Sequence, residues 1–98
     1  MKKSTIKDPG SVLDSFIKEY GMNPTRLAAA THLSQSTVRQ ITLNKMRISI
    51  PIALRFARYF GNPVDFWIDL QIQYELAKAE RNPELQKILR GIKKGTKL

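Results

Sequence analysis

The sequence predicts an all-α protein, and three observations carry this prediction. Each of the five prolines follows, within two residues, an Asp, Asn or Ser that can cap a helix, and proline itself suits the first helical turn. Apolar residues recur three and four positions apart, which is the spacing of one helix face. No stretch shows sustained period-two alternation, the pattern of a half-buried strand. We therefore expect six short helices, beginning at Asp8-Pro9, Asn23-Pro24, Ser34, Ser49-Ile50-Pro51, Asn62-Pro63 and Asn82-Pro83.

The first three predicted helices lie in the N-terminal half of the chain. The first begins at Pro9 and ends before Gly21, a residue type that accepts the left-handed cap conformation. Its apolar stripe consists of Val12, Leu13, Phe16, Ile17 and Tyr20. The second runs from Pro24 to about Thr31, and the third from Gln35 to about Leu43. With the three-residue connection between them, these two have the lengths of a helix-turn-helix, in which the small Ala28 allows a close crossing.

Two longer helices and a short one follow. The fourth begins near Pro51, ends before Gly61, and carries a stripe of Ala53, Phe56, Ala57 and Phe60. The fifth, over 64–79, is apolar around more of its circumference than a small domain can bury, so we expect it to pack against a second copy. The expected dimer interface consists of Phe66, Trp67, Leu70 and Tyr74. For Trp67, core or dimer packing is preferred to a stacking platform for single-stranded nucleic acid.

The last stripe, Leu85, Ile88, Leu89 and Ile92, predicts a short amphipathic helix with a basic end. The predicted organisation is an N-terminal arm over 1–8, a helix-turn-helix domain with a dimerising fifth helix over 9–80, and a basic amphipathic extension over 81–98. Stripe and lysines together fit a nucleic-acid arm, a membrane-surface helix or a protein-binding element.

The net charge of +9 is unevenly distributed along the chain. The 98 residues hold 17 Lys and Arg against 8 Asp and Glu. Segment 20–64 has six basic residues and no acidic one, whereas five of the acids lie in 65–84. A basic excess of this size indicates a polyanion, which is DNA, RNA or an anionic membrane surface. The acid-free segment places that contact in the middle of the chain.

Several classes of protein are excluded by what the sequence lacks. There is no cysteine, and the single His32 has no second histidine with which to hold a metal, so we expect neither metal nor cofactor. No apolar run approaches the 18 or so residues of a membrane span, and no signal peptide precedes the first helix. The basic segment holds no acid pair and no glycine-rich phosphate loop. We therefore expect a cytoplasmic protein that is not an enzyme and does not bind membranes.

The third helix is the candidate for reading DNA. On a helical wheel Val38 and Ile41 face inward, while the polar residues face outward beside Leu43. Gln pairs with adenine and Arg with guanine in the major groove, so the predicted base-reading residues are Gln35, Ser36, Arg39 and Gln40. The predicted phosphate contacts are Thr25, Ser34, Thr37, Lys45 and Arg47. Any surface helix has a polar outer face, and Arg55 and Arg58 on the fourth helix are interpreted as ordinary solvated charges.

The motifs resemble those of the lambda-repressor-like (XRE) helix-turn-helix proteins, and within them the HigA-type antitoxins. The resemblance lies in Pro9-Gly10-x-Val12-Leu13, Leu27-Ala28, Leu33-Ser34-x-Ser36-Thr37-Val38, Arg47-Ile48-Ser49, Ala53-Leu54-Arg55-x-Ala57 and Phe66-Trp67-Ile68-x-Leu70-Gln71-x-x-Tyr74. It implies a five-helix DNA-binding domain, here with one additional C-terminal amphipathic helix. Where such proteins usually have glycine in two turns, this chain has His32 and Asn44, residue types that tolerate the left-handed conformation.

The resemblance also implies a function. Such proteins dimerise, bind double-stranded DNA at a palindromic operator, repress their own operon and neutralise a cognate ribonuclease toxin. We therefore expect a homodimeric antitoxin of a type II, HigBA-like toxin–antitoxin module. The alternative is a stand-alone transcriptional repressor of phage or plasmid type without a toxin, and inspection of the adjacent reading frame discriminates between the two.

Overall fold

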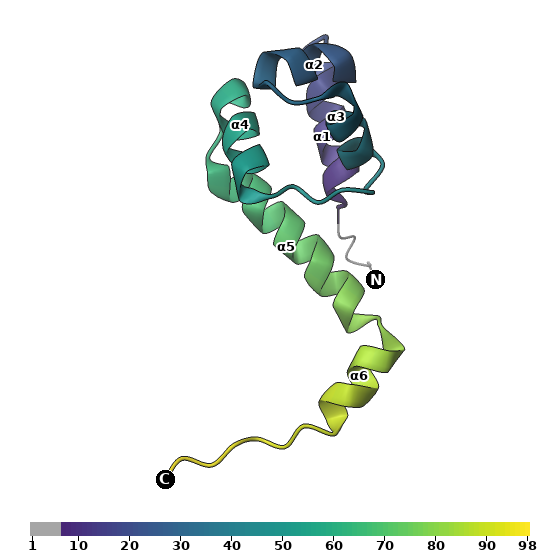
Figure 1. The fold of residues 1–98 in the computed structure, drawn as a ribbon, viewed down its shortest axis with the longest axis vertical. Coiled ribbons are helices and arrows are strands. Elements are labelled where there is room, and N and C mark those ends of the chain that lie inside the picture. The colour runs from purple at the N-terminus through teal and green to yellow at the C-terminus, as the bar shows by residue number, and fades with distance from the viewer. Residues whose placement is uncertain (1–6) are drawn as a thin grey trace, which may run out of the picture.

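The computed structural model describes residues 7–98, which form six α-helices and no strand (Figure 1). The helices are α1 (Pro9–Glu19), α2 (Pro24–Thr31), α3 (Gln35–Thr42), α4 (Ile50–Phe60), α5 (Val64–Glu80) and α6 (Pro83–Arg90). The prediction of an all-helical chain is confirmed, and the six helices follow in the predicted order. Of the expected N-terminal arm, residues 1–6 lie outside the described part of the chain.

The predicted capping side chains act as expected at four of the helices. Asp8, Asn23, Ser34 and Asn82 each accept a hydrogen bond from a backbone N–H of the first helical turn. The other two starts differ from the prediction. Ser49 is the N-cap residue of α4 as predicted but makes no side-chain cap bond. The cap predicted at Asn62 is wrong: α5 begins at Val64 with Pro63 as its N-cap residue, because the amide oxygen of Asn62 accepts the indole N–H of Trp67 instead (2.9 Å).

The hydrophobic core lies between α1, α2, α3, α4 and the first half of α5. The largest completely buried side chains include Trp67, Phe56 and Leu13. Trp67 packs among the rings of Phe16 and Phe56, with centroids 5.1 and 5.3 Å away. Its exposed fraction is 0%, so it has no surface to offer to a second copy. The structure therefore supports the core interpretation of Trp67, not a place in a dimer interface.

Two turns outside the glycines have positive φ. His32, which ends α2, has φ 60°, and Asn44, which follows α3, has φ 59°. Both were expected in this conformation, and Asn44 also fixes α3 on α1. Its side-chain oxygen accepts the N–H of Gly10 (2.9 Å) and its amide donates to Asp8 (2.6 Å). The recognition candidate α3 is thus held at its end as well as at its core face.

The second half of α5 and all of α6 project away from the helices that form the core (Figure 1). The radius of gyration is 16.9 Å, whereas a compact chain of this length has about 13 Å. No residue of α6 is buried, and Gln86 Nε2 donates to the carbonyl of Ala79 at the end of α5 (3.3 Å). Within residues 7–98, each helix is too short or too polar to span a lipid bilayer.

Candidate nucleic-acid interface

The four predicted base-reading residues lie together on the outer face of α3. All four side chains are exposed, and they line one shallow surface hollow with Leu43 and Lys45. We call this set the α3 surface; it consists of Gln35, Ser36, Arg39, Gln40, Leu43 and Lys45. Side-chain amides and a guanidinium here present the donors and acceptors that a base edge in the major groove can match.

Leu43 is the residue of this surface to which sequence reasoning gave no role. It is 61% exposed, although a leucine usually gains from burial. An apolar side chain beside amides and a guanidinium can contact the methyl group of thymine. The signal that could have assigned it was its outward position on the helical wheel.

Packing and capping together determine how α3 presents this surface. Val38 and Ile41, on the opposite face of the helix, are both 0% exposed. At the start of α3, Ser34 Oγ accepts the N–H of Thr37 (3.0 Å) and donates to Thr37 Oγ1 (2.8 Å). The Thr37 hydroxyl hydrogen remains available, so this helix start can still donate to a phosphate, as helix N-termini do.

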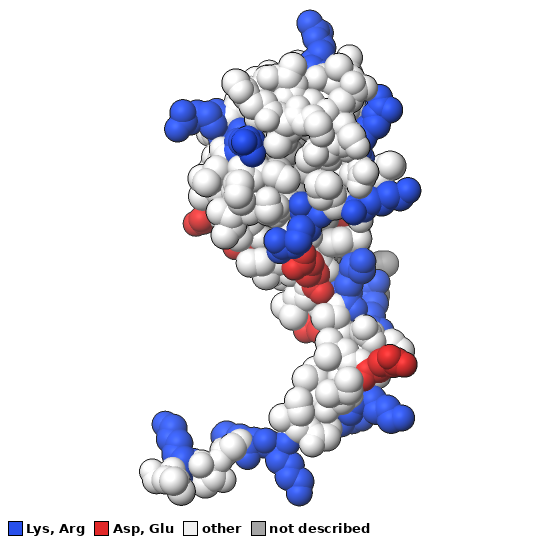
Figure 2. All heavy atoms as spheres, in the orientation of Figure 1, with Lys and Arg blue, Asp and Glu red and all other residues white. Residues whose placement is uncertain are grey.

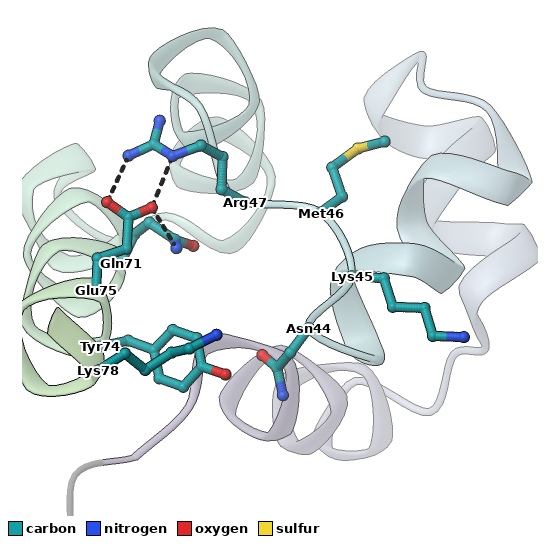
Figure 3. A pocket seen from close by; sticks show the side chains of 8 residues that line it. All are labelled: Asn44, Lys45, Met46, Arg47, Gln71, Tyr74, Glu75 and Lys78. Atoms are coloured by element: carbon teal, nitrogen blue, oxygen red, sulfur yellow. Dashed lines mark hydrogen bonds and ion pairs between the residues drawn. The ribbon is translucent and has the colours of Figure 1, made fainter. Parts of the chain in front are cut away.

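The side chains of the predicted phosphate contacts differ in where they point and in what they contact. Lys45 is exposed and lines the α3 surface, and Thr25 is exposed on the first turn of α2, outside the hollow. Arg47 instead turns to α5, where its Nε lies 2.7 Å and its terminal nitrogen 3.2 Å from the two carboxylate oxygens of Glu75 (Figure 3). The hydrogen bond from Arg47, helped by one from Gln71, lowers the pKa of Glu75 below its usual value.

The electrostatics of this region follow from the acid-free segment 20–64. In the view of Figure 2, the helices at the upper end of the molecule show blue and white atoms only, and red atoms begin where α5 begins. Within residues 7–98, the ion pairs are Lys18 with Asp14 and Arg47 with Glu75. Arg39 and Lys45 therefore carry charge that no acidic side chain in the described part of the chain neutralises. The same residues 7–98 contain no cluster of His, Asp or Glu that could hold a metal ion.

Comparison with known proteins gives a family for this arrangement. A family model described as helix-turn-helix matches residues 15–67, more than half of the chain, and includes α2, α3 and α4. The chain belongs to the XRE-type helix-turn-helix family. Its solved structural neighbours include antitoxins of the HigA family. This helix-turn-helix family is one of DNA-binding regulators and antitoxins, not of enzymes.

Three proteins that are similar to this helix-turn-helix protein show how far the similarity extends along the chain. Virulence-associated protein I of Dichelobacter nodosus is 34% identical over 78% of this chain and 71% of its own. The Pseudomonas aeruginosa protein PA4674, solved with its operator DNA, is 38% identical with a TM-score of 0.73, over 76% of this chain and 84% of its own. The Pseudomonas aeruginosa antitoxin HigA, solved with the higBA promoter, is 34% identical with a TM-score of 0.82, over 91% and 97%.

Proposed function

We propose that this helix-turn-helix protein is a sequence-specific DNA-binding antitoxin that represses its own operon within a HigBA-like module. The observation that carries this proposal is the α3 surface, where four exposed base-reading side chains and Lys45 meet in a segment without acidic residues. Two similar proteins solved with operator or promoter DNA support it.

In the proposed complex, α3 enters the major groove with its outer face toward the base edges. Gln35 and Gln40 pair with adenine, Arg39 pairs with guanine, and Ser36 accepts or donates as the sequence requires. Lys45, Thr25 and the start of α3 at Ser34 and Thr37 contact phosphates and set the register. Backbone contacts supply affinity for any sequence, and the α3 side chains supply the preference.

We further propose that two copies bind a palindromic site. Phe66, Leu70 and Tyr74 follow one another four residues apart on α5, so they form one line along the helix, and Phe66 is 40% exposed. A groove of about 670 Å³ between α1 and α5 continues this line through Val12 and Phe16. Two recognition helices related by a two-fold axis would enter successive major grooves about 34 Å apart, one turn of DNA.

The base-reading assignment is tested by Gln40→Ala. The variant should lose discrimination at one base pair of each half-site, by about 1–3 kcal/mol, because the bidentate amide contact is lost. Binding is measured against a duplex enriched from a random pool by the wild-type protein and against single-base variants of it. Gln86→Ala, a glutamine of α6 outside both the α3 surface and the α5 line, is the matched control and should bind as the wild type does. An unchanged preference in Gln40→Ala would contradict the assignment.

The antitoxin part of the proposal needs a separate test. We propose a ribonuclease toxin as the partner, encoded next to this chain, on the basis of the similarity to the antitoxin HigA. Co-expression with the adjacent gene should yield a complex that lacks the ribonuclease activity of the neighbour alone. The second candidate function is a stand-alone repressor, which the similarity to PA4674 with its operator DNA equally supports. It is favoured if the neighbour neither binds this chain nor slows growth.

We propose that residues 81–98 form a separate element that contacts a partner protein. Its helix α6 exposes Ile88 and Leu89 at 62% and 47%, and Ile92 follows at 64%. Five basic residues and no acid lie in 85–98. This combination supports a contact with a partner of the module, and removal of 81–98 should weaken toxin binding while operator preference persists.

A further inference from the structure

The connection between α3 and α4, residues 43–49, is tied to α5 by a chain of hydrogen bonds. The N–H of Ile48 donates to Gln71 Oε1 (2.9 Å), and Gln71, only 4% exposed, donates through Nε2 to Glu75 (3.0 Å). Glu75 in turn accepts two hydrogen bonds from Arg47. One face of α5 therefore determines both where the backbone of this connection lies and where the side chain of Arg47 points (Figure 3).

The two basic residues of this connection point in opposite directions. In Figure 3, Arg47 reaches onto Glu75 of α5, whereas Lys45 extends away from α5. Lys45 lines both the α3 surface and the pocket of about 300 Å³ that contains the Arg47–Glu75 pair. The two hollows are therefore adjacent. The phosphate backbone of a DNA duplex bound to the α3 surface would lie close to this connection.

The ion pair removes the charge of Arg47 from that backbone. Both carboxylate oxygens of Glu75 are engaged by the guanidinium, so the pair as a whole is neutral. Its side chains are 55% and 44% exposed, so loss of one partner leaves no buried charge unpaired, while the two parallel hydrogen bonds orient the guanidinium on α5. Removal of the acidic partner therefore frees a cation beside the DNA without unfolding the domain.

We propose that Glu75 is a positioning residue of the DNA interface: it holds Arg47 on α5, so that Lys45 is the cation that this connection gives to phosphate. This inference rests on the proposed function, and it reassigns Arg47 from the predicted phosphate contacts. Each phosphate that a protein neutralises adds affinity for every sequence and steepens the salt dependence of binding. Glu75 thus keeps the sequence-independent part of the affinity low.

The test compares Glu75→Gln with Glu80→Gln in the full chain. Both changes remove one negative charge from α5, but Glu80 is exposed and forms no ion pair within residues 7–98. Affinity is measured between about 50 and 200 mM salt, for the duplex enriched by the wild type and for a scrambled duplex of the same composition. Glu75→Gln should steepen the salt slope beyond that of Glu80→Gln by about 0.9 for each bound chain.

Glu75→Gln should therefore bind both duplexes more tightly than Glu80→Gln does. This gain in affinity should be about threefold larger per chain at 50 mM than at 200 mM salt. Arg47→Gln added to Glu75→Gln should abolish the gain, which assigns it to Arg47. Arg47→Gln alone should leave the slope unchanged, whereas Lys45→Gln should reduce it by about 0.9 per chain.

Equal slopes for Glu75→Gln and Glu80→Gln would overturn the inference, and so would a slope that falls in Arg47→Gln alone. Failure of the proposed function has a different signature. The wild type would then bind the enriched and the scrambled duplex equally well, a result that does not depend on how the slopes of the variants compare.

Discussion

Gly10 shows how a single residue determines the approach of two helices. A Cβ at this position would lie 2.7 Å from the carbonyl oxygen of Ile41 and still closer to that of Thr42, at the end of α3. Real Cβ atoms do not come so near to backbone, so α1 and α3 would have to separate. Gly10→Ala should therefore lower the free energy of unfolding by about 1–3 kcal/mol, measured by urea denaturation.

The matched control for this prediction is Gly95→Ala. Gly95 lies in the C-terminal tail, and a Cβ there meets no atom within 4 Å. Its substitution should leave the urea midpoint unchanged. If both substitutions moved the midpoint equally, the close approach at Gly10 would not be the cause of the loss.

Asp8 makes the stability of the domain depend on pH. The hydrogen bond that the Asn44 amide donates to it lowers the pKa of its carboxyl group below the usual value. A folded-state pKa below the unfolded one means that this stabilisation is complete above about pH 4 and is lost as the pH falls through the folded-state pKa. Asp8→Asn should thus be less stable than the wild type at pH 7, and the difference should shrink on acidification.

The measurement for Asp8 is a series of urea denaturations of both proteins from neutral to strongly acidic pH. Asn keeps one side-chain oxygen for the Ser11 N–H and the Asn44 amide. It loses the charge and the second oxygen, which accepts the Ser11 hydroxyl. A stability difference that stays constant across the series would show that the carboxylate of Asp8 does not carry this effect.

The α3 residues and Arg47 differ in how far the sequence could predict their positions. The outward positions of Gln35, Arg39 and Gln40 follow from helical geometry within eight residues, and the structure places them accordingly. The pairing of Arg47 depends on Glu75, 28 residues further along the chain. A local sequence pattern does not reveal a contact between residues so far apart in the chain. The sequence therefore predicts Arg47, a basic residue in an acid-free segment, as a phosphate contact.

At the scale of the element, the start of α3 is predicted to be its most sensitive end. Ser34 Oγ accepts the N–H of Thr37, so Ser34→Ala should cost about 1 kcal/mol of stability and weaken DNA binding through fraying of the first turn. Thermal unfolding and duplex binding report the two effects. Ser49→Ala at the start of α4 is the matched control, because Ser49 makes no side-chain cap bond. Equal losses in the two variants would contradict the capping role of Ser34.

The helix starts show why element boundaries were mostly predictable. Asp8, Asn23 and Asn82 cap locally, since donor and acceptor lie two or three residues apart. Asn62 precedes a proline in the same way, yet its side chain binds the indole of Trp67. The burial of Trp67 requires a partner for its N–H, and this need of the core overrides the local capping preference.

Across the whole molecule, the acid-free and the acid-rich segments lie on different helices. The acid-free segment 20–64 forms α2, α3 and α4, and five of the eight acids lie in 65–84, over α5 and the start of α6. Exposed apolar side chains such as Ile72 and Leu76, at 48% and 49%, lie on the projecting part of α5. This separation fits the proposed function, in which the acid-free helices bind DNA and the projecting part of α5 contacts a protein partner.

Dimerisation through α5 is the prediction that links these two regions. Tyr74→Lys or Phe66→Lys should convert a dimer into a monomer in light scattering, because a cation on the line of Phe66, Leu70 and Tyr74 must be desolvated at the interface. Two linked recognition helices bind with an effective concentration that a monomer lacks, so operator affinity should fall by 100-fold or more, on the order expected for loss of bivalency. Leu54→Lys, at an exposed apolar position on α4 (54%), should stay dimeric. Two α5 variants that both remain folded and dimeric would show that the partner chain binds elsewhere.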